Sequence, residues 1–234
     1  IGSATDGLNV WDEGSVGFKR FMHDPLDPLS LSAVSIYSFL VDSQDRIWIG
    51  TWSNGLNLFD LESGQSLRYI YNPNDPNSIP HNSVKCMIES SEGDIWIGTA
   101  DGGIARLSPS EEVFVRYVHD SENAISLKTS YLRSVYEDEE GVLWLGTAQE
   151  GLHRYDHQTG QFSFYLTSSG SRRDKSRGSL WAISPDDDVL WLGSGIGLGK
   201  FNKATGKTTF YEPDDSNPTS ISTNNILSVY AARC

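Results

Sequence analysis

Hydrophobic and polar residues alternate along most of the chain in short stretches that are separated by turn-forming residues. Alternation of this kind is typical of β-strands with one buried face. The stretch Ile-Trp-Ile-Gly-Thr at residues 47–51 returns with conservative changes at 95–99, 143–147 and 190–194. The tryptophans of these stretches are 48, 48 and 47 residues apart. A constant spacing predicts internal repeats, each of them one supersecondary unit.

Each repeat has the same internal order. An alternating strand, such as residues 84–87, is followed by a polar turn and then by the tryptophan strand. A glycine turn leads to a third strand, as at 151–156, and a second glycine turn leads to a fourth strand that ends on an aromatic residue. Short turns join antiparallel neighbours. The pattern therefore predicts an all-β chain, a β-propeller of four-stranded antiparallel blades that bury one another's faces.

The two ends of the chain suggest how the last blade is completed. Four whole blades are predicted at about 34–70, 82–118, 130–166 and 178–212. Residues 1–21 resemble the later strands of a blade, and residues 224–230 resemble a first strand. We expect one five-bladed domain over 1–234, closed by the N- and C-terminal strands and cut from a longer chain. The alternative is an arc of a larger ring, which would expose two apolar blade faces.

Charge and composition limit the classes of partner that the chain is expected to bind. The formal net charge is −13 with 18 Lys and Arg among 234 residues, which argues against nucleic acid and against an anionic membrane surface. Two cysteines make no disulfide framework, and no run of 18 apolar residues exists. We therefore expect no nucleic-acid partner and no membrane contact by this segment.

Candidate catalytic groups are sparse, so we predict no enzyme, no cofactor and no metal site. The five histidines show no metal-ligand spacing, and His23 and His119 share one place after a fourth strand. The acidic turns at 42–45 and 185–188 could offer oxygen ligands to calcium, but we interpret them as solvated hairpin turns. Paired carboxylates for glycoside cleavage depend on their separation in space, which leaves a propeller enzyme as an alternative.

Two positions vary between repeats that are otherwise uniform, and we predict a ligand site there. The second residue of the first strand is Tyr37, Lys85, Arg133, Trp181 or Leu227, and the turn after the tryptophan strand varies likewise. Both places lie toward one end of a propeller. Aromatic and polar side chains suit the apolar faces and hydroxyls of a sugar. Unconstrained variation is the alternative. The predicted ligand-binding residues are Tyr37, Trp52, Lys85, Asp101, Arg133, Gln149 and Trp181.

Three motifs link the chain to a known family. They are Asn-x-Val-x-x-Met-x-Glu at 82–89, Gly-x-Ile-Trp-Ile-Gly-Thr at 93–99 and Gly-Gly-Ile at 102–104, with linkers at 75–79 and 218–222. The chain resembles the two-component regulator propeller repeat family. That resemblance implies the periplasmic sensor region of a bacterial hybrid histidine kinase or diguanylate cyclase, often responding to saccharides. The family's usual seven blades differ from the five predicted here.

The resemblance implies a function for the segment. We expect a non-catalytic ligand-sensing propeller, periplasmic or extracellular, that recognises a saccharide or similar small molecule. A homodimer through propeller faces or open ends is a further expectation. The alternatives are a secreted propeller lectin or scaffold without a signalling role, and a propeller lyase or glycosidase.

Overall fold

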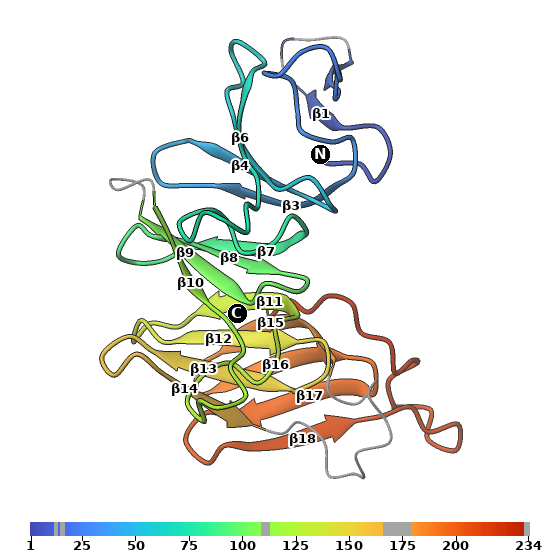
Figure 1. Ribbon diagram of the computed structural model, residues 1–234. Helices are drawn as coiled ribbons and strands as arrows, with labels where there is room; N and C mark the ends of the chain where they lie inside the picture. Colours follow the sequence, from blue (N-terminus) through green and yellow to red (C-terminus); the bar gives the residue numbers. More distant parts are fainter. Residues whose placement is uncertain (12–13, 15–16, 109–112, 166–178, 232–234) are drawn as a thin grey trace. The chain divides into compact units, whose positions relative to one another are not determined.

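The chain folds into strands that form separate antiparallel sheets. The computed structural model describes residues 1–11, 14, 17–108, 113–165 and 179–231 (Figure 1). These residues form 18 strands in five sheets, and no helix occurs among them. The predicted all-β propeller class with repeated antiparallel blades is confirmed. None of the described residues belongs to a helix that is long and apolar enough to span a bilayer.

Four of the sheets have four strands each, and consecutive strands of the chain are neighbours in every one of them. Alternating apolar residues and glycine-containing turns explain these meanders, because each hairpin places the next strand beside the last. The strands are β3 (Ile36–Val41), β4 (Ile47–Thr51), β5 (Leu56–Phe59), β6 (Ser66–Tyr69); β7 (Val84–Glu89), β8 (Ile95–Thr99), β9 (Ile104–Ser108), β10 (Val113–Tyr117); β11 (Leu132–Glu137), β12 (Leu143–Thr147), β13 (Leu152–Asp156), β14 (Gln161–Tyr165); and β15 (Leu180–Asp186), β16 (Val189–Ser194), β17 (Gly197–Asn202), β18 (Lys207–Tyr211).

The chain consists of two compact units. The N-terminal unit contains residues 1–117 and the C-terminal unit contains residues 118–234. The strands of the four complete sheets lie inside the four predicted blade ranges. The predicted blade ends at 166 and 178 lie outside the described residues, as do parts of the ranges 1–21 and 82–118.

The fifth sheet contains the later blade strands that the sequence predicts within residues 1–21. It has two strands, β1 (Leu8–Trp11) and β2 (Phe18–Phe21), and β1 pairs with no other strand. Residues 224–230 form no strand; the amide of Ile226 instead donates to the carbonyl oxygen of Ser194 at 2.9 Å. The amide of Ile36 makes the same bond to Ser3, so Ile226 docks as the first residue of a first strand. The completion of the last blade by the two chain ends stays a prediction.

Three of the four second-strand tryptophans lie in the core, whereas Trp191 is only half-buried. Trp48 and Trp96 are at most 1% exposed, and Trp144 is 3% exposed. Trp48 packs in one cluster with Val84 and Phe114 of the next blade in the N-terminal unit. Such burial stabilises by roughly 25 cal/mol for each Å² of apolar surface removed from water. Consecutive blades within a unit therefore depend on each other's side chains.

The acidic turn before the second strand is part of the core. The Asp42 carboxylate is buried and accepts a 2.8 Å hydrogen bond from the indole Nε1 of Trp48. Asp138 accepts the same bond from Trp144 at 2.8 Å. Burial alone would raise the pKa of Asp42, but hydrogen bonds from Trp48, Arg46 and Gln44 outweigh it and lower the pKa. Our interpretation of the turn at 42–45 as solvated holds for the exposed residues 43–45 but is wrong for Asp42, because a buried indole N–H requires an acceptor.

Two linkers of the N-terminal unit are each fixed by one serine. The hydroxyl of Ser78 accepts from the amide of Asn72 at 2.8 Å, and Arg116 of the fourth strand donates to the carbonyl oxygens of Ser78 and Asp75. Ser30 and Arg68 repeat this arrangement. The linkers thereby hold the entrance of each first strand in place.

Candidate functional site

Every complete blade has a β-bulge in its first strand at the predicted variable position. Ile36 pairs with Thr51 and Ser38 with Gly50, which leaves Tyr37 as the extra residue. The same shift leaves Lys85, Arg133 and Trp181 unpaired in their blades. A bulge redirects the side chain of its extra residue and is common beside functional sites. The variable positions therefore share one backbone device.

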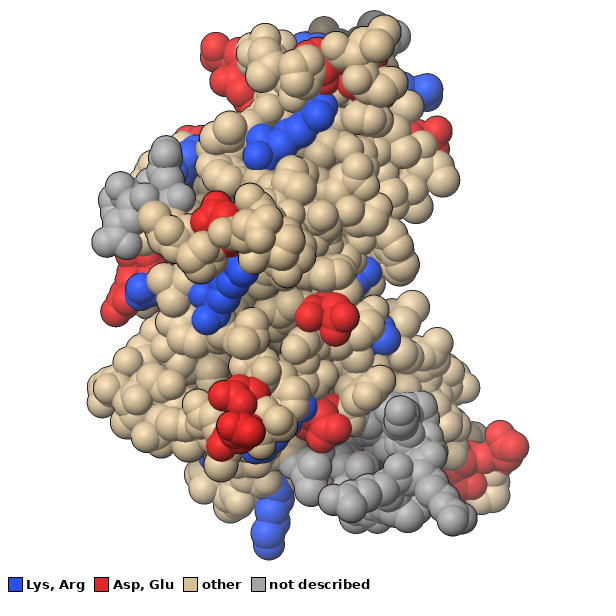
Figure 2. All heavy atoms as spheres, in the orientation of Figure 1, with Lys and Arg blue, Asp and Glu red and all other residues tan. Residues whose placement is uncertain are grey.

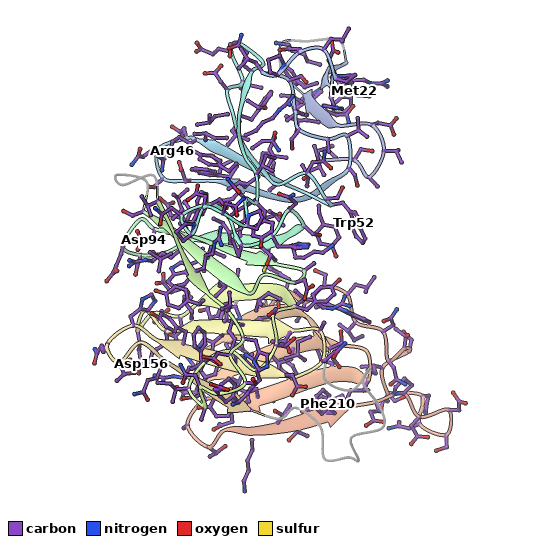
Figure 3. The ribbon with its side chains drawn as sticks, viewed as in Figure 1. Met22, Arg46, Trp52, Asp94, Asp156 and Phe210 are labelled. Atoms are coloured by element: carbon purple, nitrogen blue, oxygen red, sulfur yellow. The ribbon has the colours of Figure 1, made fainter. Side chains whose placement is uncertain are left out.

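In the N-terminal unit, three predicted residues meet in what we call the first cluster: Tyr37, Trp52 and Lys85. The Lys85 ammonium lies 3.9 Å from the ring centroid of Tyr37 and 3.5 Å from that of Trp52. Lys85 is 5% exposed, whereas Tyr37 and Trp52 are 48% and 54% exposed. An enclosed cation thus supports two rings that face solvent, through cation–π attraction. Trp52 lies at the molecular surface in Figure 3.

The backbone positions Trp52 beside Tyr37. Trp52 directly follows β4, and its amide donates to the carbonyl oxygen of Ser35 at 3.0 Å. The Thr51 hydroxyl donates to Gly55 and accepts from the amide of Asn54, which holds the turn. The two rings are 5.4 Å apart and inclined by 51°. The first cluster is therefore held by main-chain contacts of two blades' first strands and one turn.

In the C-terminal unit, a second cluster consists of Tyr131, Arg133 and Trp181. The guanidinium carbon of Arg133 lies 5.2 Å from the ring centroid of Tyr131 and 5.6 Å from that of Trp181. All three residues are half-buried. Each unit therefore pairs a cation and an aromatic residue from neighbouring bulges.

Tyr131 is missing from the sequence-based prediction. It precedes a first strand, where the other complete blades have Ser35, Ser83 and Ser179. Its carbonyl oxygen accepts from the amide of Ala148, as Ser35 does from Trp52. An aromatic residue at a position otherwise occupied by serine is the signal that could have revealed it.

Two predicted residues are not brought into either cluster. Asp101 and Gln149 are exposed in the turns that follow β8 and β12. These turns are held by Thr99 and Thr147, whose hydroxyls donate to Gly103 and Gly151. Their place in the ligand site stays a prediction.

The histidines have structural surroundings. Nδ1 of His23 lies 2.7 Å from the carbonyl oxygen of Leu31, and Nδ1 of His119 lies 2.6 Å from that of Leu127. His153 is completely buried in β13. Over the part of the chain that the structure describes, no group of three or more His, Cys, Asp or Glu residues could hold a metal ion.

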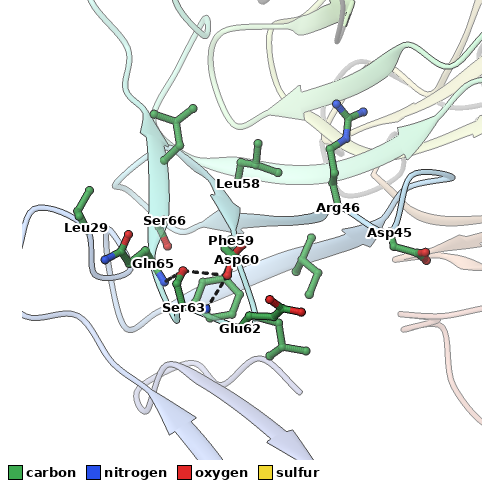
Figure 4. A pocket seen from close by; sticks show the side chains of 13 residues that line it. Leu29, Asp45, Arg46, Leu58, Phe59, Asp60, Glu62, Ser63, Gln65 and Ser66 are labelled. Atoms are coloured by element: carbon green, nitrogen blue, oxygen red, sulfur yellow. Dashed lines mark hydrogen bonds between the residues drawn. The ribbon is translucent and has the colours of Figure 1, made fainter.

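One cavity of the N-terminal unit lies away from the first cluster. It has a volume of about 780 Å³ and is lined mainly by β5, β6, the turn that joins them and the turn before β4 (Figure 4). Asp45 and Arg46 line it at the start of β4, whereas Trp52 follows the end of that strand. Leu29, Leu61 and Leu67 give it an apolar wall. No side chain of the first cluster reaches it, so we place the candidate site at the bulges and not in this cavity.

Three segments match the family profile described as "Two component regulator propeller", at residues 30–53, 78–101 and 126–149. These three segments are similar to the repeats of the two component regulator propeller family. Each matched segment contains a linker serine, a first strand with its bulged residue and a tryptophan strand. The family motif thus includes the backbone device that presents Tyr37, Lys85 and Arg133, while their identities differ.

Solved structures share the fold of these propeller repeats. One is the extracellular domain of a B. thetaiotaomicron protein described as a hybrid two component system: TM-score 0.73, 22% identity, 96% of this chain and 28% of that chain covered. Another is PorZ, a bacterial surface component of the type-IX secretion system of Porphyromonas gingivalis: TM-score 0.71, 16% identity, 99% and 34% covered. A third is an inactive virginiamycin B lyase from Staphylococcus aureus with quinupristin: TM-score 0.58, 17% identity, 77% and 56% covered.

At these levels of sequence identity, the similarity to the three structures shows a shared fold only. The propeller-repeat chain spans only about a quarter to a third of the first two proteins. None of the curated proteins compared with the sequence matches it.

Proposed function

We propose that this chain is the ligand-recognition part of an extracytoplasmic bacterial sensor, and that it binds a saccharide without converting it. The observation that carries the proposal is the bulge that recurs in four blades and presents four different side chains on one framework. Binding residues are commonly mounted in this way, on variable positions of a rigid scaffold.

The chemistry of the two clusters supports a saccharide. A sugar ring has an apolar face that packs on an aromatic ring, and hydroxyls that need hydrogen-bond partners. Trp52 and Tyr37 offer solvent-facing rings, and Lys85 holds them from beneath. Because the Lys85 ammonium already occupies these rings, a cationic ligand is disfavoured there.

The family supports a place outside the cytoplasm. The repeats are those of two component regulators, and one similar structure is an extracellular domain of a protein described as a hybrid two component system. Signalling belongs in this proposal to the parent protein of which the chain would be one part.

A thermal-shift screen with neutral and acidic oligosaccharides tests the proposal. A ligand at a hundred times its Kd stabilises the folded state by about 2.7 kcal/mol, which raises Tm by roughly 5–10 °C for a chain of this size. Substitution Trp52→Ala or Trp181→Ala should reduce the shift produced by a saccharide that binds at the corresponding cluster.

Trp11→Ala is the matched control, since Trp11 is 57% exposed against 54% for Trp52 and belongs to no cluster. The saccharide recovered after incubation should be unchanged in mass, which separates recognition from lyase or glycosidase activity. The proposal fails if no saccharide shifts Tm, or if Trp11→Ala abolishes the shift while Trp52→Ala and Trp181→Ala leave it intact.

A further inference from the structure

Arg133 differs from the other half-buried arginines of the described residues. Arg46, Arg106 and Arg154 form ion pairs with Asp42, Asp94 and Asp156. Arg68 and Arg116 donate to linker carbonyl oxygens. Within the described ranges, Arg133 makes neither an ion pair nor a hydrogen bond, and its Nε is buried without an acceptor.

The neighbouring Trp181 also has a buried N–H donor, its indole Nε1, without an acceptor among the described residues. A guanidinium has five N–H donors and no acceptor, and an indole nitrogen only donates. Buried donors in folded proteins are nearly always paired, so unpaired ones point to a missing acceptor. Two such donors belong to side chains in contact with each other.

The rings strengthen the case for a negatively charged acceptor. The guanidinium carbon of Arg133 lies over the rings of Tyr131 and Trp181, and a guanidinium makes its hydrogen bonds in plane, through its N–H edge. That edge matches the two oxygens of a carboxylate or sulfate. The chain carries −13 overall, but acidic and basic side chains are scattered on the face drawn in Figure 2. Charges farther away than about 10 Å are largely screened at physiological salt, so a ligand at the second cluster mainly experiences the positive charge of Arg133.

We infer that the second cluster binds an anionic group of the ligand, with the Arg133 guanidinium and the Trp181 indole N–H as its donors. The inference rests on the proposed function and specifies its ligand as an acidic saccharide, one that carries a carboxylate or a sulfate. The acidic group lies against Arg133, and the neighbouring sugar face packs on Trp181 or Tyr131.

Isothermal titration with trigalacturonate and its methyl ester tests this, because esterification removes the negative charge of the carboxyl groups and leaves the sugar rings unchanged. A sulfated disaccharide distinguishes sulfate from carboxylate. We expect the wild-type protein to bind an acidic probe at least ten-fold more tightly than the ester. Arg133→Gln should weaken that binding about 10- to 100-fold, the worth of a charge-assisted hydrogen bond, and leave the ester unaffected.

Arg154→Gln is the matched control, since Arg154 is half-buried in the same unit but is paired with Asp156. Arg133→Lys keeps the positive charge but loses the paired N–H donors of the guanidinium, so we expect a smaller loss of affinity for the acidic probe than with Arg133→Gln. If Arg133→Gln does not fold, Arg133→Lys replaces it in the test. Equal affinity for acid and ester, with no effect of Arg133→Gln, overturns the inference and leaves the proposed function standing. Absence of binding by every saccharide overturns both.

Discussion

At the scale of the residue, equivalent positions show what each blade tolerates. One third-strand position is occupied by Asn57, Ala105, His153 and Gly199 in the four complete blades. The Asn57 amide is satisfied by Ser32, whose backbone amide donates to it at 2.8 Å. His153 instead stacks edge-on against Phe164, with ring centroids 4.8 Å apart. A titratable ring therefore occupies an apolar place that other blades fill with neutral groups.

His153 should make stability depend on pH. Burial lowers its pKa to about 4; the backbone of Glu150 acts in the opposite direction, and the charge of Lys128 lowers the pKa further. The imidazole of His153 binds a proton near pH 6.5 in the unfolded chain but not in the folded chain. The free energy of unfolding is therefore undiminished above that pH and falls as the pH drops toward 4. The loss amounts to about 3 kcal/mol.

Urea unfolding between pH 7 and 4.5 measures this loss. His153→Asn and His153→Ala, the residues of the sister blades, should flatten the pH dependence whatever their effect on stability at pH 7. If both variants keep the wild-type slope between pH 6.5 and 4.5, His153 is not the responsible group.

At the scale of the element, the glycine of the tryptophan strand lets the next blade of the same unit approach, as Gly50 and Gly146 show. A Cβ at Gly146 would collide with the Ser134 hydroxyl and lie 2.9 Å from the carbonyl oxygen of Leu180 in the following blade. At Gly50 it would lie 2.6 Å from a methyl group of Val84. The Trp-x-Gly motif is thus explained by contact between blades as well as by the strand itself.

Gly146→Ala should therefore destabilise the protein by about 1–3 kcal/mol, the usual cost of overpacking a close contact. Denaturant unfolding followed by tryptophan fluorescence provides the measurement. Gly14→Ala, where an added methyl group meets nothing within 4 Å, is the control and should change stability little. A Gly146→Ala protein as stable as the wild type would show that the blades are not packed as described.

Much of each blade could be predicted from sequence, because alternation and turn glycines act locally. The bulge could not be predicted, because it is a register shift that depends on how two strands pair. The sequence shows only that the side chain at the bulged position varies between repeats. The buried state of Asp42 was missed because acidic turns are usually solvated, whereas here an indole N–H six residues later needs an acceptor.

At the scale of the whole molecule, the proposed function depends on the same feature repeated in each unit. The first cluster exposes two rings over an enclosed lysine, and the second holds an arginine that lacks a polar partner within the described residues. Both arise where a bulged residue of one blade meets that of the next. We regard the repeated framework as the support and the bulged residues as the recognition elements.

The most direct test of this view is an NMR titration of the seven tryptophan indole N–H signals with the saccharide that raises Tm most. The buried indoles of Trp48, Trp96 and Trp144 serve as internal references. We predict that the signals of Trp52, Trp181 or both shift on binding while these references stay in place. Shifts confined to Trp11 or Trp191, with Trp52 and Trp181 unmoved, would contradict a ligand site at the bulges.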